Sequence, residues 1–151
     1  MPIAGNECNF FLFFLQRREF LKQHINASLV GAVYLERAMK EFRQQFASKG
    51  GVVFVVASDD LAWCRANVRS VADDVVYAGD GDGDAFNPAL DMALLAACNH
   101  SIITYGNFGF WSAYLAGGQT LLAGNLSETP TELMLTIRKA SIDGWRFLPG
   151  L

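Results

Sequence analysis

Short apolar segments alternate with helix-forming segments five times along this chain of 151 residues, and this alternation limits the fold more than any other feature. The first apolar segment, residues 8–15, is almost continuously apolar, as in a strand that is buried on both faces. Further short apolar runs rich in β-branched residues predict four more strands. The five predicted strands are residues 8–15, 52–56, 75–77, 102–104 and 120–122.

The segments between these strands have helical periodicity and residues typical of helix ends. Apolar residues recur every three to four positions from Leu35 to Phe46, which is typical of an amphipathic helix. Ser58 or Asp59 is the expected N-cap of a short helix through Cys64. A further helix is predicted at 87–98, where Asn87-Pro88 marks its start. The last two predicted helices run from the glycine turn at 106–109 to Gly117-Gly118, and over residues 131–140.

Strands that alternate with helices through short connections predict an α/β fold, a Rossmann-like open parallel sheet with flanking helices. No linker or repeat divides the chain, so we expect residues 1–151 to form one domain. In such sheets ligands bind beyond the carboxyl ends of the strands. Candidate site residues are therefore sought where a strand ends and a helix begins.

Charge and cysteine content exclude two classes of partner. The net charge of −3 and the pI of about 5.3 give no electrostatic attraction for nucleic acid, so an anionic ligand must be held by a few local groups. Cys8, Cys64 and Cys98 lack the spacing of zinc ligands, and we expect no metal. The Asp80-to-Asp84 segment resembles the start of a calcium loop, but Ala85 and Asp91 stand where that loop requires Gly and Glu.

Arg17 and Arg18 directly follow the first apolar segment. Two guanidinium groups at the end of a strand can bind a pyrophosphate through paired hydrogen bonds. The alternative is a solvated loop, in which adjacent arginines are common.

A glycine turn follows the fourth predicted strand, and its members are Gly106, Asn107, Phe108 and Gly109. Glycine allows backbone N–H groups and a helix N-terminus to approach a phosphate closely. The segment does not have the G-x-G-x-x-G or Walker pattern, so an ordinary tight turn is the alternative.

Three polar residues, Ser58, Asp59 and Asp60, follow the second strand. A carboxylate there can bind a sugar or ribose hydroxyl, and the alternative is a helix cap with acids in the first turn. The two histidines, His24 and His100, have no spacing that identifies a catalytic base, and His100 at the start of a strand is typical of a structural residue.

One long stretch is similar to a known family. Asp91 to Gly118, DMALLAACNHSIITYGNFGFWSAYLAGG, closely resembles the third motif of the animal α-1,2-fucosyltransferases, which form glycosyltransferase family eleven. Shorter segments also look like parts of this family, and they are residues 34–43, 53–64 and 76–81.

The resemblance implies the C-terminal, donor-binding half of a two-domain GT-B enzyme, with this chain as a fragment of it. Members transfer L-fucose from GDP-β-L-fucose to the 2-hydroxyl of a terminal β-galactose on a glycan, invert the anomeric centre and need no metal or other cofactor. Animal members are glycosylated type II Golgi membrane proteins. This chain shows no run of the roughly 20 apolar residues that an anchor needs. Sequons at Asn26, Asn99 and Asn125 agree with a secretory origin.

By resemblance, Arg17 and Arg18 match the arginine pair that meets the GDP pyrophosphate, and Gly106–Gly109 would face the phosphates. Asn99 and His100 match positions that hold the guanosine in related enzymes. Further candidates for the donor site are Ser58, Asp59, Asp60 and Asp91.

The first family motif normally reads His-x-Arg-Arg-Gly-Asp, whereas this chain has LQRREF at residues 15–20. The alternative function is therefore a catalytically inactive relative or truncated fragment that still binds a GDP-sugar.

Overall fold

The computed structural model describes residues 9–15, 31–78, 87–124 and 130–149, with backbone only for 9–15. They form one six-stranded sheet in which every neighbouring pair of strands is parallel. Its strands, in spatial order, are β3 (Val75–Tyr77), β2 (Val52–Ser58), β1 (Asn9–Leu15), β4 (His100–Ile103), β5 (Thr120–Gly124) and β6 (Trp145–Pro149). This order, 3-2-1-4-5-6, is that of the Rossmann fold. The fold-class prediction is confirmed.

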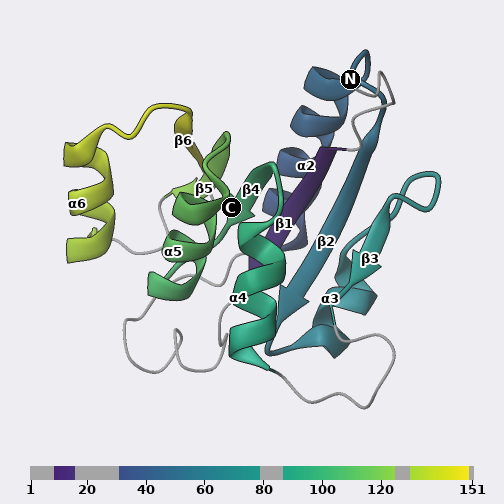
Figure 1. Ribbon diagram of the computed structural model, residues 1–151, viewed down its shortest axis with the longest axis horizontal. Coiled ribbons are helices and arrows are strands. Elements are labelled where there is room, and N and C mark those ends of the chain that lie inside the picture. Colours follow the sequence, from purple (N-terminus) through teal and green to yellow (C-terminus); the bar gives the residue numbers. More distant parts are fainter. Residues whose placement is uncertain (1–8, 16–30, 79–86, 125–129, 150–151) are drawn as a thin grey trace, which may run out of the picture.

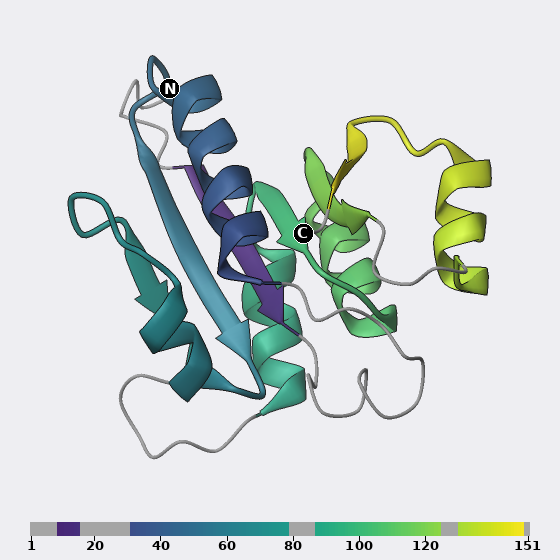
Figure 2. The same cartoon turned by 180° about the vertical axis from the view of Figure 1, so that it is seen from behind.

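Five helices join these strands and lie on both faces of the sheet. They are α2 (Ala32–Phe46), α3 (Leu61–Asn67), α4 (Pro88–Ala96), α5 (Asn107–Ala116) and α6 (Glu132–Ala140). Figure 1 shows α4 and α5 in front of the sheet, and Figure 2 shows α2 on the opposite face. Because each of these connections joins parallel strands, every one of the helices begins at the end of the sheet where the strands finish.

Alternating strand residues divide the core into two layers. Phe54 and Val56 of β2 face the α2 side, and the neighbouring Val55 and Ala57 pack with α4, α5 and α6. Side chains of β4 and β5 alternate in the same way. Such buried strands have apolar residues on both faces, which is why they read as continuous apolar runs in the sequence.

Strand β1 occupies the middle of the sheet. It pairs with β2 along its seven residues, from Asn9 to Leu15, and with β4 from Phe11 to Phe14. The predicted strand over residues 8–15 is confirmed in its backbone as Asn9–Leu15, with a neighbouring strand at each of its two edges. The chain therefore reverses its direction of winding at the β1–β4 pair.

The sixth strand was missed by the sequence analysis, which predicted five. β6 contains Arg146 and ends at Pro149, neither of which is typical of a central strand. Both are tolerated because β6 pairs only with β5 and forms an edge of the described sheet. The fourth strand is also displaced from its predicted bounds, running over residues 100–103 instead of 102–104.

Tyr34, in the first turn of α2, fixes this helix against the sheet. Its hydroxyl is buried and lies 3.0 Å from the carbonyl oxygen of Ile103 and 3.2 Å from that of Leu121. The single O–H hydrogen donates to one of these oxygens at a time. The start of α2 is thereby held near the end of β4.

Replacing Tyr34 by Phe should reduce the free energy of unfolding by about 1 kcal/mol, since the ring is kept and a buried hydrogen bond is lost. Burial raises the pKa of Tyr34 above its ordinary value. The contribution is therefore fully present below the unfolded-state pKa of about 10 and is lost only as pH rises through the higher folded-state pKa. Urea unfolding at neutral pH measures the change, and an unaltered midpoint for Tyr34→Phe would show that the bond contributes nothing.

Candidate functional site

The β1–β4 pair is the switch point of the sheet, where the direction of winding reverses. The connection after β1 leads to α2 on one face, and the connection after β4 leads to α5 on the other. Connections that leave neighbouring strands towards opposite faces open a space between them, and ligands of open α/β sheets bind at such a switch point. The topology thus selects one location on the molecule.

Helix α5 begins at this switch point with a glycine in place of a capping side chain. Gly106 is the N-cap of α5 and is buried. Its backbone has φ 100° and ψ 165°, a conformation that residues other than glycine rarely adopt. In contrast, three other helices have N-cap side chains that accept a hydrogen bond from a first-turn N–H. These residues are Asp60 of α3, Asn87 of α4 and Thr131 of α6.

The N-terminus of α5 therefore lacks the side-chain cap that those three helices have. No N-cap side chain of α5 competes for the N–H groups of its first turn. These N–H groups and the positive end of the helix dipole attract phosphate oxygens. In this first turn Asn107 is exposed, Phe108 is half-buried and Gly109 is buried.

The N-terminus of helix α2 also lacks a capping side chain, a feature that the sequence analysis missed. Its N-cap is Gly31, again without a capping side chain, and Tyr34 ties its first turn to the end of β4. The sequence signal was Gly31 immediately before a helical pattern. Two helix N-termini without capping side chains thus approach the switch point from opposite faces.

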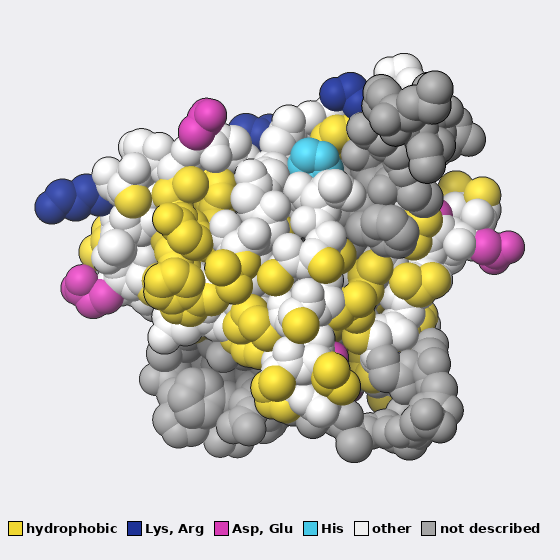
Figure 3. Space-filling view, in the orientation of Figure 1, with side chains coloured by type: hydrophobic (Ala, Val, Ile, Leu, Met, Phe, Trp, Pro, Cys, Tyr) yellow, Lys and Arg dark blue, Asp and Glu magenta, His cyan; other side chains and the backbone are white. Residues whose placement is uncertain are grey.

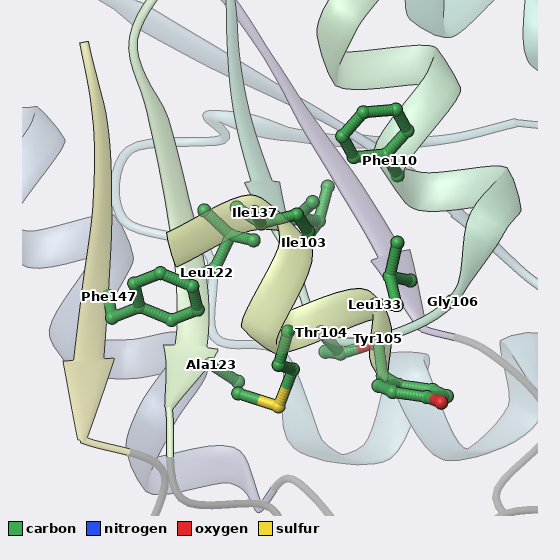
Figure 4. A pocket seen from close by; sticks show the side chains of 11 residues that line it. Ile103, Thr104, Tyr105, Gly106, Phe110, Leu122, Ala123, Leu133, Ile137 and Phe147 are labelled. Atoms are coloured by element: carbon green, nitrogen blue, oxygen red, sulfur yellow. The ribbon is translucent and has the colours of Figure 1, made fainter. Parts of the chain in front are cut away.

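A small cavity lies beside Gly106, below the carboxyl ends of β4 and β5 (Figure 4). Its volume is about 10 Å³, which is enough for about one water molecule. Its lining is almost entirely apolar and comes from β4, β5, β6, α5 and α6. The cavity is thus a packing space and is too small for a nucleotide base.

The polar residues after β2 form a helix cap. Ser58 is buried and its hydroxyl accepts a hydrogen bond of 3.0 Å from the Asp60 backbone N–H. Asp60 in turn accepts from the N–H of Trp63 at 3.0 Å and is the N-cap of α3. The predicted N-cap, Ser58 or Asp59, was wrong by one or two residues, and the capping alternative accounts for Ser58 and Asp60. Asp59 is exposed at the same end of the sheet.

Asp91 lies in the first turn of α4, whose N-terminus also faces this end of the sheet. Partial burial raises the pKa of its carboxyl group. A carboxyl group in this setting is more easily protonated than an exposed aspartate.

Asn99 and His100 do not join the other candidates. Asn99 lies in the turn before β4 and His100 is the first residue of β4, so both are at the amino end of the sheet, opposite Gly106. The sequence analysis assigned them to the donor site because they match guanosine-binding positions of related enzymes, but β4 separates them from the glycine turn in space. The Asn99 side chain is exposed.

His100 has a structural role, as its position at the start of a strand predicted. Its Nδ1 accepts a hydrogen bond of 3.0 Å from the Gln119 backbone N–H, and its ring lies 4.5 Å from the ring of Phe46. Burial, and then the charge of Lys49, lower the pKa of His100. The imidazole is therefore neutral near pH 7, as an accepting Nδ1 requires.

Arg17 and Arg18 lie outside the described residues, as do the Asp80-to-Asp84 segment and the sequons at Asn26 and Asn125. In the sequence, Gln16 alone separates Arg17 from the last residue of β1. The arginine pair stays a prediction for the β1 side of the switch point.

The described residues contain neither a cluster of metal-binding side chains nor a membrane-spanning helix. Among them, no three His, Cys, Asp or Glu side chains gather in a way that could hold a metal ion. None of the helices in this part of the chain has both the length and the apolar character to cross a membrane.

Comparison with known proteins agrees with the sequence motif. The sequence model of glycosyl transferase family 11 matches residues 14–148. Galactoside alpha-(1,2)-fucosyltransferase 2 of Mus musculus is 44% identical over 120 residues, which cover 78% of this chain and 33% of the mouse protein. Galactoside alpha-(1,2)-fucosyltransferase 1 of Sus scrofa is 48% identical over 106 residues, which cover 70% of this chain and 27% of the pig protein.

No solved structure matches the chain. The chain spans about a third or less of the length of these curated relatives. The family match extends from the last two residues of β1 into β6 and so includes the strands of the described sheet apart from most of β1. The chain therefore belongs to glycosyl transferase family 11.

Proposed function

We propose that this chain is the donor-binding part of an inverting α-1,2-fucosyltransferase and that it binds GDP-β-L-fucose at the β1–β4 switch point. The observation that carries the proposal is the glycine-capped start of α5 at that point, in a chain that belongs to glycosyl transferase family 11. The relatives are named galactoside fucosyltransferases, which supports a galactose-terminated glycan as the acceptor.

In the proposed reaction the 2-hydroxyl oxygen of galactose forms a bond to C1 of fucose. The bond between C1 and the β-phosphate oxygen breaks, the hydroxyl proton passes to a base, and GDP leaves with the electron pair. The departing diphosphate gains negative charge, and preformed N–H groups and cations stabilise such charge without reorganisation. The N-terminus of α5 supplies the N–H groups.

Arg17 and Arg18 are proposed to supply the positive charge, and no metal or other cofactor is invoked. Arginine binds phosphate oxygens through two parallel hydrogen bonds and remains charged at every relevant pH. Asp59 and Asp91 are proposed to make smaller contributions to donor binding, since both lie at the same end of the sheet as Gly106. For the whole enzyme we propose a Golgi location with the catalytic part in the lumen.

Calorimetric titration of the chain with GDP, in the presence of a chelator, tests the donor site. Arg17→Ala and Arg18→Ala should each weaken binding roughly 10- to 150-fold, which corresponds to about 1.5–3 kcal/mol for a charged hydrogen bond. Arg69→Ala is the matched control, because Arg69 is exposed in the turn before β3, at the amino end of the sheet.

Three results would count against the proposal. A folded chain that does not bind GDP has no donor site. Binding that is lost with the chelator requires a metal. Equal weakening by Arg69→Ala would mean that GDP responds to the overall charge and not to a local arginine pair.

A further inference from the structure

The exposed surfaces of α4 and α5 contain almost no charge. The one charged residue in either helix, Asp91, is partly buried. Five large apolar side chains on this surface are between 43% and 66% exposed, and they are Leu90, Leu94, Trp111, Tyr114 and Leu115. These five side chains form a surface that we call the α4–α5 face.

The other long helices of the same protein are built differently. The exposed side of α2 carries Glu36, Arg37 and Lys40, and that of α6 carries Glu132, Arg138 and Lys139. A surface helix normally has such a polar side, and a helix that is apolar all round is normally covered. The contrast within one chain indicates that the α4–α5 face is covered by another surface.

The face is continuous and large enough to be an interface. Figure 3 shows hydrophobic side chains gathered over α4 and α5, and most of the charged side chains in this view lie towards its periphery. The five side chains together expose on the order of 500 Å², which is near the upper end for a patch on a monomer. Pro88, Ala89 and Ala93 are also exposed on α4 and extend it towards the roughly 800 Å² per partner of a standard interface.

Two aromatic rings are held in place on this face by other rings. Phe110 lies 5.2 Å from Trp111 in an edge-to-face contact and 6.0 Å from Tyr114 in a stacked one, measured between ring centres. Behind it, the ring of Trp145 lies 5.4 Å from that of Phe110. Rigid exposed Trp and Tyr side chains lose little freedom on association, and they are enriched at the centres of protein interfaces.

We propose that the α4–α5 face is a two-fold symmetric interface between two copies of this chain. A two-fold contact places the same surface on both sides, so a charged surface would repel itself. This face is neutral although the chain has a net charge of −3, and the charged helices lie elsewhere. Two pairs of apolar helices can pack against each other by the ridges-into-grooves contacts of helix bundles.

A lipid surface fits the same face less well. Helices that lie on membranes combine an apolar side with lysine and arginine that attract anionic headgroups. Neither α4 nor α5 contains a lysine or an arginine, and neither does the segment between them, residues 97–106. A protein surface of the same apolar kind is therefore the better match.

Sedimentation velocity of the whole chain, from about 1 µM upward, tests the proposal, because a small interface associates weakly and its dimer is populated only at higher concentration. The mass should rise with concentration from 16.6 kDa to that of two chains. Leu94→Glu and Leu115→Glu should each raise the dissociation constant at least about tenfold, because each brings like charges together across the contact.

Val33→Glu is the control, since Val33 is 55% exposed on α2 at the opposite face of the sheet, and dimerisation should be unchanged. Far-UV circular dichroism of each variant verifies that it is folded, and two glutamate variants guard against one that is not. A folded chain that remains monomeric at every concentration would overturn the proposal. So would self-association that neither glutamate variant reduces, or a monomer that sediments with lipid vesicles.

Discussion

Gly118→Ala is expected to lower the free energy of unfolding by about 3 kcal/mol or more, the upper range for an overpacked site. A Cβ at this position would lie 1.7 Å from the carbonyl oxygen of Asn99 and 2.8 Å from Nδ1 of His100. Real Cβ atoms do not approach backbone atoms this closely, so the chain must move. The loss is a large part of the 5–15 kcal/mol by which a domain of this kind is normally stable.

The surrounding hydrogen bonds explain why the movement is costly. Gln119 donates its N–H to Nδ1 of His100, and its carbonyl oxygen accepts from the N–H of Ser101 at 2.8 Å. Displacing Gly118 from Asn99 strains both bonds and the start of the β4–β5 pair. The clash is with the backbone and with a half-buried ring that a hydrogen bond holds in place, so no freely moving side chain relieves it.

The neighbouring glycine is the control for this experiment. Gly117 has φ 74° and ends α5 in the left-handed conformation, and a Cβ there would meet nothing closer than 4.0 Å. Gly117→Ala should therefore cost only the roughly 1–2 kcal/mol of that backbone conformation. Urea unfolding of both variants measures the difference. Equal losses would show that the close approach of Gly118 to Asn99 is relieved without cost.

Asp74→Asn should reduce the free energy of unfolding by about 2 kcal/mol at neutral pH, because it removes the charged partner of a largely buried arginine. Asp74 accepts hydrogen bonds from Nε of Arg43 at 2.6 Å and from its second guanidinium nitrogen at 3.0 Å. It also accepts from the backbone N–H of Val71 at 2.8 Å. The Arg43 guanidinium lies 4.9 Å from the ring centre of Phe54 and is thus held against the core.

The same carboxylate predicts a dependence of stability on pH. Burial by itself would raise the pKa of Asp74, but the hydrogen bonds from Arg43 and Val71, with the charge of Arg43, outweigh it and lower the pKa. A lowered folded-state pKa gives stability that is present above the unfolded-state value of about 3.9 and is lost as pH falls through the folded-state pKa. The wild-type chain should lose this contribution below about pH 4, and Asp74→Asn should lose less over the same range.

Asp73→Asn is the matched control, with the same chemical change one residue away. Asp73 is exposed and has φ 57°, a conformation that asparagine tolerates as well as aspartate. Its replacement should leave the free energy of unfolding within about 0.5 kcal/mol of the wild-type value, as for most surface changes. If Asp73→Asn and Asp74→Asn have equal effects, the Arg43 contact is not the cause.

Local signals predicted most of the architecture because they act over a few residues. Asn87-Pro88 predicted the start of α4, and the structure shows Asn87 accepting from the Leu90 N–H as its cap. Gly117 ends α5 in the conformation that glycine favours. Apolar runs predicted the strands whose two faces are both buried. They failed at β6, because an edge strand keeps polar residues and proline that a central strand would exclude.

The candidate site was predicted in part for the same reason. The glycine turn at Gly106 and the ends of the strands are local features, and the rule for open α/β sheets placed them at one end. Asn99 and His100 were assigned to the same site by resemblance, and only the structure shows that β4 separates them from Gly106. The capping role of Asp60 also depended on a hydrogen bond that two adjacent aspartates made ambiguous.

The class of fold and the family could be assigned from local features of the sequence. Apolar periodicity, glycines at helix ends and one long motif each involve residues that are neighbours in the chain. Only the tertiary structure decided the order of the strands and hence the single switch point, since strand pairing joins residues far apart in the chain. It also decided that Gly118 must lack a side chain. The almost uncharged surface of α4 and α5 likewise emerged only when packing showed which of their apolar side chains the core leaves exposed.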